Sequence, residues 1–198
     1  MKHIAVLLFE DFETLDVFGP VGIFGRLMDL FTIKFFSLDG GEIRNRHGVA
    51  MKTEKLSTIT MDTEIFLIPG GQGTRREVEN RPLIGQIARI SDLCKYVLTV
   101  CTGSALLAQT GLLDRKAATS NKRAFAWAMT NGAEVLWNRN ARWTVDGKFY
   151  TSSGVSAGMD MALGFLCDCY GIGLARKIAL EIEYNWTEDK NDDVFRVE

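Results

Sequence analysis

The sequence predicts an α/β domain built on a mainly parallel sheet. Short apolar runs typical of buried strands alternate with stretches whose apolar residues recur at helical spacing, and this alternation favours a parallel sheet. The 198 residues suit one domain with a full hydrophobic core. No linker or internal repeat divides them, so we expect residues 1–198 to form a single domain.

The N-terminal half is expected to contain three central strands and two helices. Pro20 fits the first turn of a helix better than its interior, so the first helix should begin near Gly19 or kink there. The expected elements are a strand at 3–9, a helix within 15–30, a strand at 31–38, a turn at 39–41, a hairpin around 46–48 that reaches Lys52, a strand at 64–68 closed by Pro-Gly-Gly, and a helix at 81–93.

The C-terminal half continues the alternation and ends in a helical region. Asp146-Gly147 between two apolar runs is a strong hairpin signal. The tail after Thr187 is charged and is expected to be loosely held. The expected elements are a strand from 96 that ends at Cys101, helices at 103–110 and 123–130, a hairpin of 142–145 with 149–152, and a helical region at 155–186 interrupted near 171–173.

The segment around Cys101 carries the strongest functional signal. A run fit for a buried strand ends at this cysteine, and a small-residue turn opens a helical pattern directly after it. Unpaired backbone N–H groups and the positive end of the helix dipole stabilise a thiolate at such a place. The arrangement parallels the strand–nucleophile–helix elbow of hydrolases, with Gly103 where a side chain would crowd the turn. The alternative is a buried structural cysteine.

Three loops leave the carboxyl ends of expected strands, where ligands bind in open α/β sheets. These loops, at 10–16, 69–71 and 101–102, hold polar, glycine and reactive residues, and their convergence favours Cys101 as a nucleophile. Backbone N–H groups of Gly70, Gly71 and Thr102 could hold negative charge that develops on a substrate. For Pro-Gly-Gly the alternative is a simple turn.

A nucleophilic thiol also needs a proton donor or acceptor, and two acids are candidates. Asp16 lies between Leu15 and Val17, where apolar neighbours would desolvate its carboxyl group and raise its pKa. Glu13 belongs to the same loop. The alternatives are an exposed helix position for Asp16 and, for Glu13, an acid that complements a helix dipole.

Composition argues against several classes of function. The formal net charge of −2 gives no support to nucleic-acid binding, and no stretch approaches the roughly 20 apolar residues of a membrane span. The first apolar run is too short for a signal peptide, so we expect a cytoplasmic protein. Four cysteines and two histidines offer neither a disulfide framework nor a metal-ligand pair, so we expect no metal and no cofactor.

Four segments together resemble the ThiJ/PfpI superfamily, which has the class I glutamine amidotransferase-like fold. They are IAVLLFEDFETLDVFGP, FLIPGG, VCTGSALLAQTGLLDRKAAT and SSGVSAGMDMAL, and the resemblance covers nearly the whole chain. Within the superfamily the chain is most similar to the isonitrile hydratase group. That group has an acid ahead of an apolar-Gly-Pro segment, matched by Asp16, and a Cys-Thr-Gly elbow, matched by Cys101 and the two residues after it.

The resemblance implies a flavodoxin-like sandwich with helices on both faces of the sheet, and a homodimer. It also implies Cys101 as the nucleophile and Asp16 as its acid–base partner. Some transcription regulators carry a similar domain followed by a helix-turn-helix domain. No such segment precedes Glu198, so we expect no nucleic-acid partner.

One departure from the superfamily pattern bears on the activity. Many relatives have a histidine where this chain reads Ser120-Asn121-Lys122. Asn121 can hydrogen-bond to a substrate but cannot shuttle protons. Its presence counts against protease or amidase activity, and less against a hydratase that uses a cysteine and a carboxyl group.

The leading hypothesis is an enzyme that adds water to a small electrophilic carbon, as in an isonitrile. Cys101 would attack the carbon, while Asp16 would protonate it and later activate water. Gly71 and Thr102 would hold the charge, and Asn121 would orient a small-molecule substrate. Two alternatives stay open: a glyoxalase-, deglycase- or amidase-like enzyme acting on small carbonyls, and a non-catalytic sensor in which Cys101 is oxidised reversibly.

Overall fold

The computed structural model describes residues 1–60 and 63–197, and its centre is the expected mainly parallel sheet. Over these residues the strand order is β3-β4-β2-β1-β5-β6-β10-β9, with antiparallel pairing at the two edges, β3–β4 and β10–β9. The strands are β1 (Lys2–Leu7), β2 (Phe31–Ser37), β3 (Gly41–Arg44), β4 (Ala50–Lys55), β5 (Thr63–Ile68), β6 (Tyr96–Thr99), β9 (Trp143–Asp146) and β10 (Phe149–Ser152).

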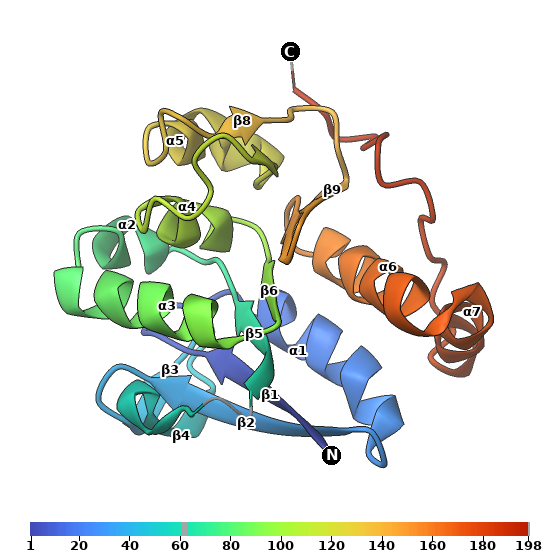
Figure 1. Cartoon of the computed structure of the whole chain (residues 1–198), viewed down its shortest axis with the longest axis horizontal. Helices are drawn as coiled ribbons and strands as arrows, with labels where there is room; N and C mark the ends of the chain where they lie inside the picture. The colour runs from blue at the N-terminus through green and yellow to red at the C-terminus, as the bar shows by residue number, and fades with distance from the viewer. Residues whose placement is uncertain (61–62, 198) are drawn as a thin grey trace.

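Helices cover both faces of this sheet, which is the flavodoxin-like arrangement that the resemblance implied (Figure 1). On one face α1 (Thr14–Phe24) packs against α6 (Ala157–Tyr170), and α6 packs against α7 (Ile172–Glu181). On the other face lie α2 (Thr74–Glu77), α3 (Arg81–Leu93) and α4 (Gly103–Ala108), with α5 (Phe125–Met129) against α4. No helix within the described ranges is long and apolar enough to cross a membrane.

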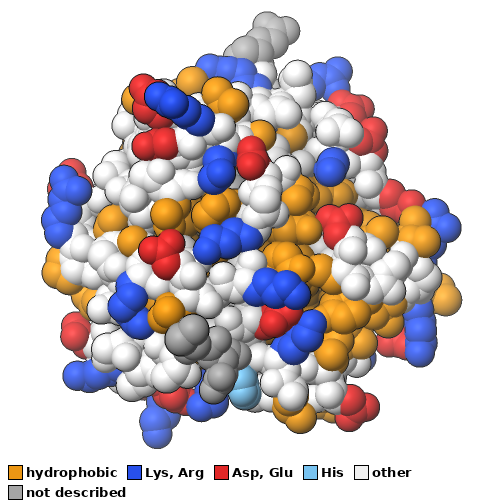
Figure 2. All heavy atoms as spheres, in the orientation of Figure 1, with side chains coloured by type: hydrophobic (Ala, Val, Ile, Leu, Met, Phe, Trp, Pro, Cys, Tyr) orange, Lys and Arg blue, Asp and Glu red, His pale blue; other side chains and the backbone are white. Residues whose placement is uncertain are grey.

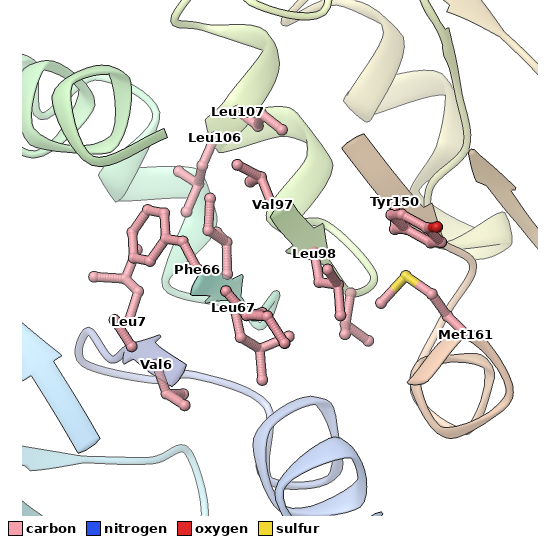
Figure 3. Close-up of a cluster of buried hydrophobic side chains, with 14 of the residues drawn as sticks. Val6, Leu7, Phe66, Leu67, Val97, Leu98, Leu106, Leu107, Tyr150 and Met161 are labelled. Atoms are coloured by element: carbon pink, nitrogen blue, oxygen red, sulfur yellow. The ribbon is translucent and has the colours of Figure 1, made fainter. Parts of the chain in front are cut away.

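The central strands build a buried layer on each face of the sheet (Figure 3). Phe66 of β5 and Val97 of β6 extend toward Leu106 of α4, whereas their neighbours Leu67 and Leu98 extend to the opposite face. All five side chains are fully buried. Because both faces are covered, these strands appear in the sequence as continuous apolar runs rather than as an alternation of polar and apolar residues.

The first helix differs from its expected start. It begins at Thr14 and continues through Pro20, rather than beginning near Gly19. A proline inside a helix cannot donate the helical hydrogen bond, which costs stability. Packing of the apolar face, including the fully buried Phe24, outweighs that loss. The earlier start places Asp16 in the first turn of α1.

The C-terminal tail is held by specific contacts, so the expectation of a loose tail is wrong. The helical region is interrupted at Gly171, as expected, but α7 ends at Glu181 instead of near residue 186. The carboxylate of Asp193 is fully buried and accepts a hydrogen bond from Arg142 Nη1 at 3.3 Å. Arg142 N donates to the carbonyl oxygen of Lys190 at 2.8 Å. One charge of the tail, the Asp193 carboxylate, therefore has a buried partner, which composition alone does not reveal.

Several short elements were not predicted from the sequence. They are α2, a separate pair of two-residue strands, β7 (Ala117–Ala118) and β8 (Leu136–Trp137), and the 3-10 helix η2 (Leu56–Thr58). Such segments are too short to show a hydrophobic period. The 3-10 helices η1 (Gly25–Leu27) and η3 (Lys122–Ala124) overlap the helices expected at 15–30 and 123–130. Charged side chains of both signs are interspersed over the face shown in Figure 2, in keeping with the small net charge.

Candidate active site

Cys101 occupies a strained turn between β6 and α4. Its φ of 58° lies in the left-handed region, which non-glycine residues adopt mainly where the surroundings hold them and often at functional sites. The Cys101 N–H donates to Ser153 O at 3.1 Å. Its carbonyl oxygen accepts from Ser104 Oγ at 3.1 Å and from Ser120 Oγ at 3.0 Å. The predicted elbow is confirmed, whereas its three serine supports were not predicted.

Two glycines allow the site loops to approach one another. A Cβ on Gly103 would overlap the carbonyl oxygen of Ile68, so the elbow needs a glycine there. Gly71 has a φ of 133° and forms an isolated bridge with Phe12, and a Cβ on it would lie 2.5 Å from Glu13 N. The loops at 10–16, 69–71 and 101–102 therefore converge as predicted.

Asp16 is fully buried, which excludes an exposed helix position for it. Its Oδ2 accepts a hydrogen bond from Gly70 N at 2.9 Å, whereas no described residue donates to its buried Oδ1 at hydrogen-bond distance. Burial raises the pKa of the Asp16 carboxyl well above its usual range, and Glu13 adds to the rise. Interactions with the Gly70 N–H and the Cys101 thiol oppose it.

The thiol of Cys101 does not have the lowered pKa expected at a helix N-terminus. Burial raises its pKa, and the charge of Asp16 raises it further. The backbone N–H groups of Thr102 and Val155 lower it, but by less. Desolvation beside a carboxylate thus outweighs the helix terminus. The Cys101 thiol and the Asp16 carboxyl group therefore interact with each other in the folded chain.

The N–H groups of Gly70 and Gly71 have different roles from the expected one. Both already donate to side chains: Gly70 to Asp16, and Gly71 to Thr102 Oγ1 at 3.1 Å. They therefore position the acid and the elbow instead of facing a substrate. The donors beside the sulfur are the N–H groups of Thr102 and Val155. Val155 belongs to the SSGVSAG segment after β10, at the same edge of the sheet, and that shared edge could have identified it.

A cavity of about 510 Å³ opens over Cys101. Its walls include Gly71, Thr102 and Asn121, which the sequence predicted, and Glu13. Three arginines that were not predicted, Arg46, Arg75 and Arg123, also line it.

Asn121 has a structural task in addition to its place in the cavity wall. Its Oδ1 accepts a hydrogen bond from Ala124 N at 3.1 Å and so caps the short helix η3. Neither histidine lines the cavity, and His47 Nδ1 instead lies 2.6 Å from Thr14 Oγ1. Among residues 1–60 and 63–197, no group of three or more His, Cys, Asp or Glu side chains could hold a metal ion.

Comparisons with known proteins show relatives in both sequence and fold. The isonitrile hydratase of Pseudomonas putida is 29% identical over 182 residues, which cover 92% of this chain and 78% of that protein. The crystal structure of a ThiJ/PfpI family protein from Pseudomonas syringae has a TM-score of 0.80 and 27% identity, covering 93% of this chain and 75% of the other. Drosophila melanogaster DJ-1beta shares the fold, with a TM-score of 0.79 at 18% identity over 93% of this chain and 99% of its own.

The family model that matches is described as the DJ-1/PfpI family, and the match spans residues 2–167. That range contains the whole central sheet, the cysteine elbow and both loops that meet it. With most of its length matched in this way, the chain belongs to the DJ-1/PfpI family.

Proposed function

We propose that the protein is a cysteine enzyme that hydrates small isonitriles to formamides. The observation that carries this proposal is the buried Asp16 carboxyl group beside the Cys101 thiol. Asp16 forms no ion pair with a cation among the described residues. Cys101 lines a cavity that is large enough for a small molecule. The likeness to an isonitrile hydratase over 92% of the chain supports it. Within this reading Cys101 is the nucleophile and Asp16 moves the protons.

The first half of the reaction forms a covalent intermediate. Asp16 accepts the proton of the Cys101 thiol as the sulfur attacks the isonitrile carbon, and then delivers that proton to the same carbon. The new C–S and C–H bonds make a thioimidate, and Asp16 is again a carboxylate. A carboxyl group whose pKa burial has raised is a stronger base for this step than an exposed one.

The second half adds water and releases the product. Asp16 takes a proton from water as the oxygen bonds to the thioimidate carbon, and passes that proton to the nitrogen. The hydroxyl proton then moves through Asp16 to the sulfur as the C–S bond breaks. The products are an N-substituted formamide and the original thiol. The N–H groups of Thr102 and Val155 would stabilise negative charge beside the sulfur, and Asn121 would orient the substrate.

The sensor hypothesis has less support from the site. A redox-sensing cysteine works best as an exposed thiolate of low pKa. Cys101 is only 6% exposed, and burial raises its pKa. The site itself offers no observation that favours carbonyl substrates over isonitriles.

The test is product analysis with matched variants. Wild type incubated with a small alkyl isonitrile should yield the N-alkyl formamide, measured by NMR, whereas Cys101→Ala should yield none. Asp16→Asn should lose about 10²–10⁴-fold in rate, the usual worth of one proton-transfer group. Cys167→Ala, outside the cavity, is the control and should keep the wild-type rate.

Three outcomes would redirect the proposal. Formamide formation by folded Cys101→Ala would exclude the cysteine as the nucleophile. Full activity of Asp16→Asn would make Glu13 the next candidate for the acid. If wild type forms no formamide while mild peroxide converts Cys101 cleanly to one oxidised form, the sensor hypothesis takes precedence.

The homodimer implied by the family resemblance is also part of the proposal. Figure 2 shows hydrophobic side chains gathered on the visible face beside α6, a composition that suits a contact between subunits. Light scattering of the purified protein would give a mass of twice 22.1 kDa if the dimer forms.

A further inference from the structure

Positive charge exceeds negative charge on the wall of the Cys101 cavity. Arg46, Arg75 and Arg123 line it, and of the described lining residues only Glu13 is a carboxylate. Glu13 is already engaged, because its Oε2 lies 3.7 Å from Arg46 Nη1. Arg75 and Arg123 form no ion pair with any described residue. The proposed hydration of an uncharged isonitrile needs neither of these cations.

Contacts hold the Arg75 guanidinium in one orientation and leave some of its N–H groups without an acceptor among the described residues. Its Nη1 donates to Gly71 O at 3.2 Å and to Thr74 Oγ1 at 3.1 Å, and the guanidinium lies 4.2 Å from the ring centre of Trp127. Its Nε and Nη2 groups donate to no described residue. Those two groups form the edge of a guanidinium that binds a carboxylate through two parallel hydrogen bonds.

The electrostatic surroundings of Arg75 link it to the nucleophile. Burial lowers the pKa of Arg75, and Cys101 in its thiolate form opposes this effect, so the guanidinium interacts with the sulfur once the thiol has lost its proton. A half-buried guanidinium without a counter-ion is poorly stabilised. An anion bound between Arg75 and the elbow would supply the missing partner.

We propose that the substrate of this site carries a carboxylate group, which Arg75 and Arg123 bind while Cys101 attacks the neighbouring electrophilic carbon. The inference rests on the proposed function for the reaction and adds the chemical class of the substrate. Arg75 supplies the fixed two-hydrogen-bond edge. Arg123 is exposed and contributes a second positive charge at the rim.

The first test compares two alkylating probes of similar size and opposite charge state. Iodoacetate is an anion and iodoacetamide is neutral, so the ratio of their rates at Cys101 measures the preference of the cavity for a carboxylate. Peptide mass spectrometry at pH 8.5 gives this ratio for Cys101 and, in the same sample, for Cys167, which lies outside the cavity. We expect the ratio at Cys101 to exceed that at Cys167 by about tenfold to a hundredfold, as for hydrogen bonds to a charged group.

Matched variants assign that preference to the arginines. Arg75→Gln with Arg123→Gln should bring the Cys101 ratio down to that of Cys167, and Arg75→Lys should give an intermediate value because it keeps the charge and loses the two-bond edge. Arg76→Gln is the control: Arg76 Nε pairs with Glu77 at 2.9 Å outside the cavity, so the ratio should not change. A wild-type ratio at or below that of Cys167, or one that the double variant leaves unchanged, would overturn the inference.

The second test separates this inference from the proposed function. Isocyanoacetate and isocyanoacetamide differ only in the charged group, so wild type should hydrate the carboxylate with a kcat/KM about tenfold or more above that of the amide. If both are hydrated equally and the alkylation ratio is flat, the carboxylate inference fails and the hydratase proposal stands. If the alkylation ratio shows the preference and neither isonitrile is hydrated, the hydratase proposal fails and the anion-binding site stands.

Discussion

Asp16 and Asp160 are both fully buried, but their carboxyl groups have different neighbours. Both oxygens of Asp160 are saturated: Oδ2 accepts from Arg142 Nε at 2.8 Å and lies 2.7 Å from Arg142 Nη2, and Oδ1 accepts from Tyr184 Oη and Thr187 N, each at 3.0 Å. Asp16 has one backbone donor and one buried oxygen without a donor among the described residues. The two carboxyl groups therefore differ in the number of hydrogen-bond donors that reach their oxygens, and not in burial.

The difference separates a structural acid from one that can exchange a proton. Burial raises the pKa of both carboxyl groups, but at Asp160 Thr187, Arg142 and Tyr184 all oppose the rise. A carboxylate with four donors has no lone pair left for a substrate. The undersaturated oxygen of Asp16 can receive a proton from the neighbouring thiol.

The buried charged residues around Arg142, here called the structural cluster, also contact a residue next to the cavity wall. Arg142 joins Asp160 to Asp193, and Lys122 Nζ lies 4.0 Å from Asp193 Oδ2. Burial lowers the pKa of Lys122 to about 8, and Asp193 opposes that effect. Lys122 directly follows Asn121, a residue of the cavity wall. The C-terminal tail is therefore connected to the candidate active site through buried charges.

The largest expected effect comes from removing the cation of the structural cluster. Arg142→Met leaves Asp160 and Asp193 buried without their arginine, and should lower the free energy of unfolding by about 3–5 kcal/mol. Urea titration measures this loss. Arg176→Met, which breaks an exposed pair with Glu188, should leave the free energy of unfolding nearly unchanged, because exposed ion pairs contribute little to stability. If Asp16→Asn proves as destabilising as Arg142→Met, the distinction between the two buried acids is wrong.

The second prediction concerns pH and stability at Asp16. The native pKa of this carboxyl lies above its unfolded value, so its contribution to stability is fully present below the unfolded pKa and is lost as pH rises toward the native pKa. Relative to Asp16→Asn, wild type should therefore become less stable from pH 4 upward, by at most about 1.4 kcal/mol per pH unit. Urea titrations of both proteins at several pH values measure the difference. A difference that grows in favour of wild type with rising pH would contradict the assignment.

The comparison also shows what the sequence could predict. The sheet, the elbow at Cys101 and the acid at Asp16 follow from local patterns, because strand runs, a Gly at the turn and apolar flanks are all visible along the chain. The saturation of Asp160 was not predicted, because its donors lie 18 to 27 residues away in sequence. Nothing local marks a partner at that separation.

The same limit applies to the arginines of the cavity and to the thiol. Arg46 of the β3–β4 turn, Arg75 of α2 and Arg123 of η3 are far apart in sequence and meet only in the folded chain. The direction of the Cys101 pKa was predicted wrongly because the helix terminus is a local feature, whereas the burial and the charge of Asp16 are tertiary ones. Local backbone geometry was thus more predictable than the electrostatics it creates.

The smallest expected effect is a shift in the pH profile of Cys101 alkylation. Because the charge of Asp16 raises the pKa of the thiol, Asp16→Asn should move the iodoacetamide rate profile of Cys101 toward lower pH. Because its pKa is raised, we also expect the Cys101 thiol to react slowly with iodoacetamide at neutral pH. Its position at a helix N-terminus had suggested a fast reaction instead. Stopped alkylation with mass spectrometry from pH 6 to 10 gives the profile, and Glu54→Gln, an exposed acid of β4, should leave it unchanged. A shift toward higher pH in Asp16→Asn would mean that Asp16 stabilises the thiolate, and the proton would then have to leave the sulfur by another route.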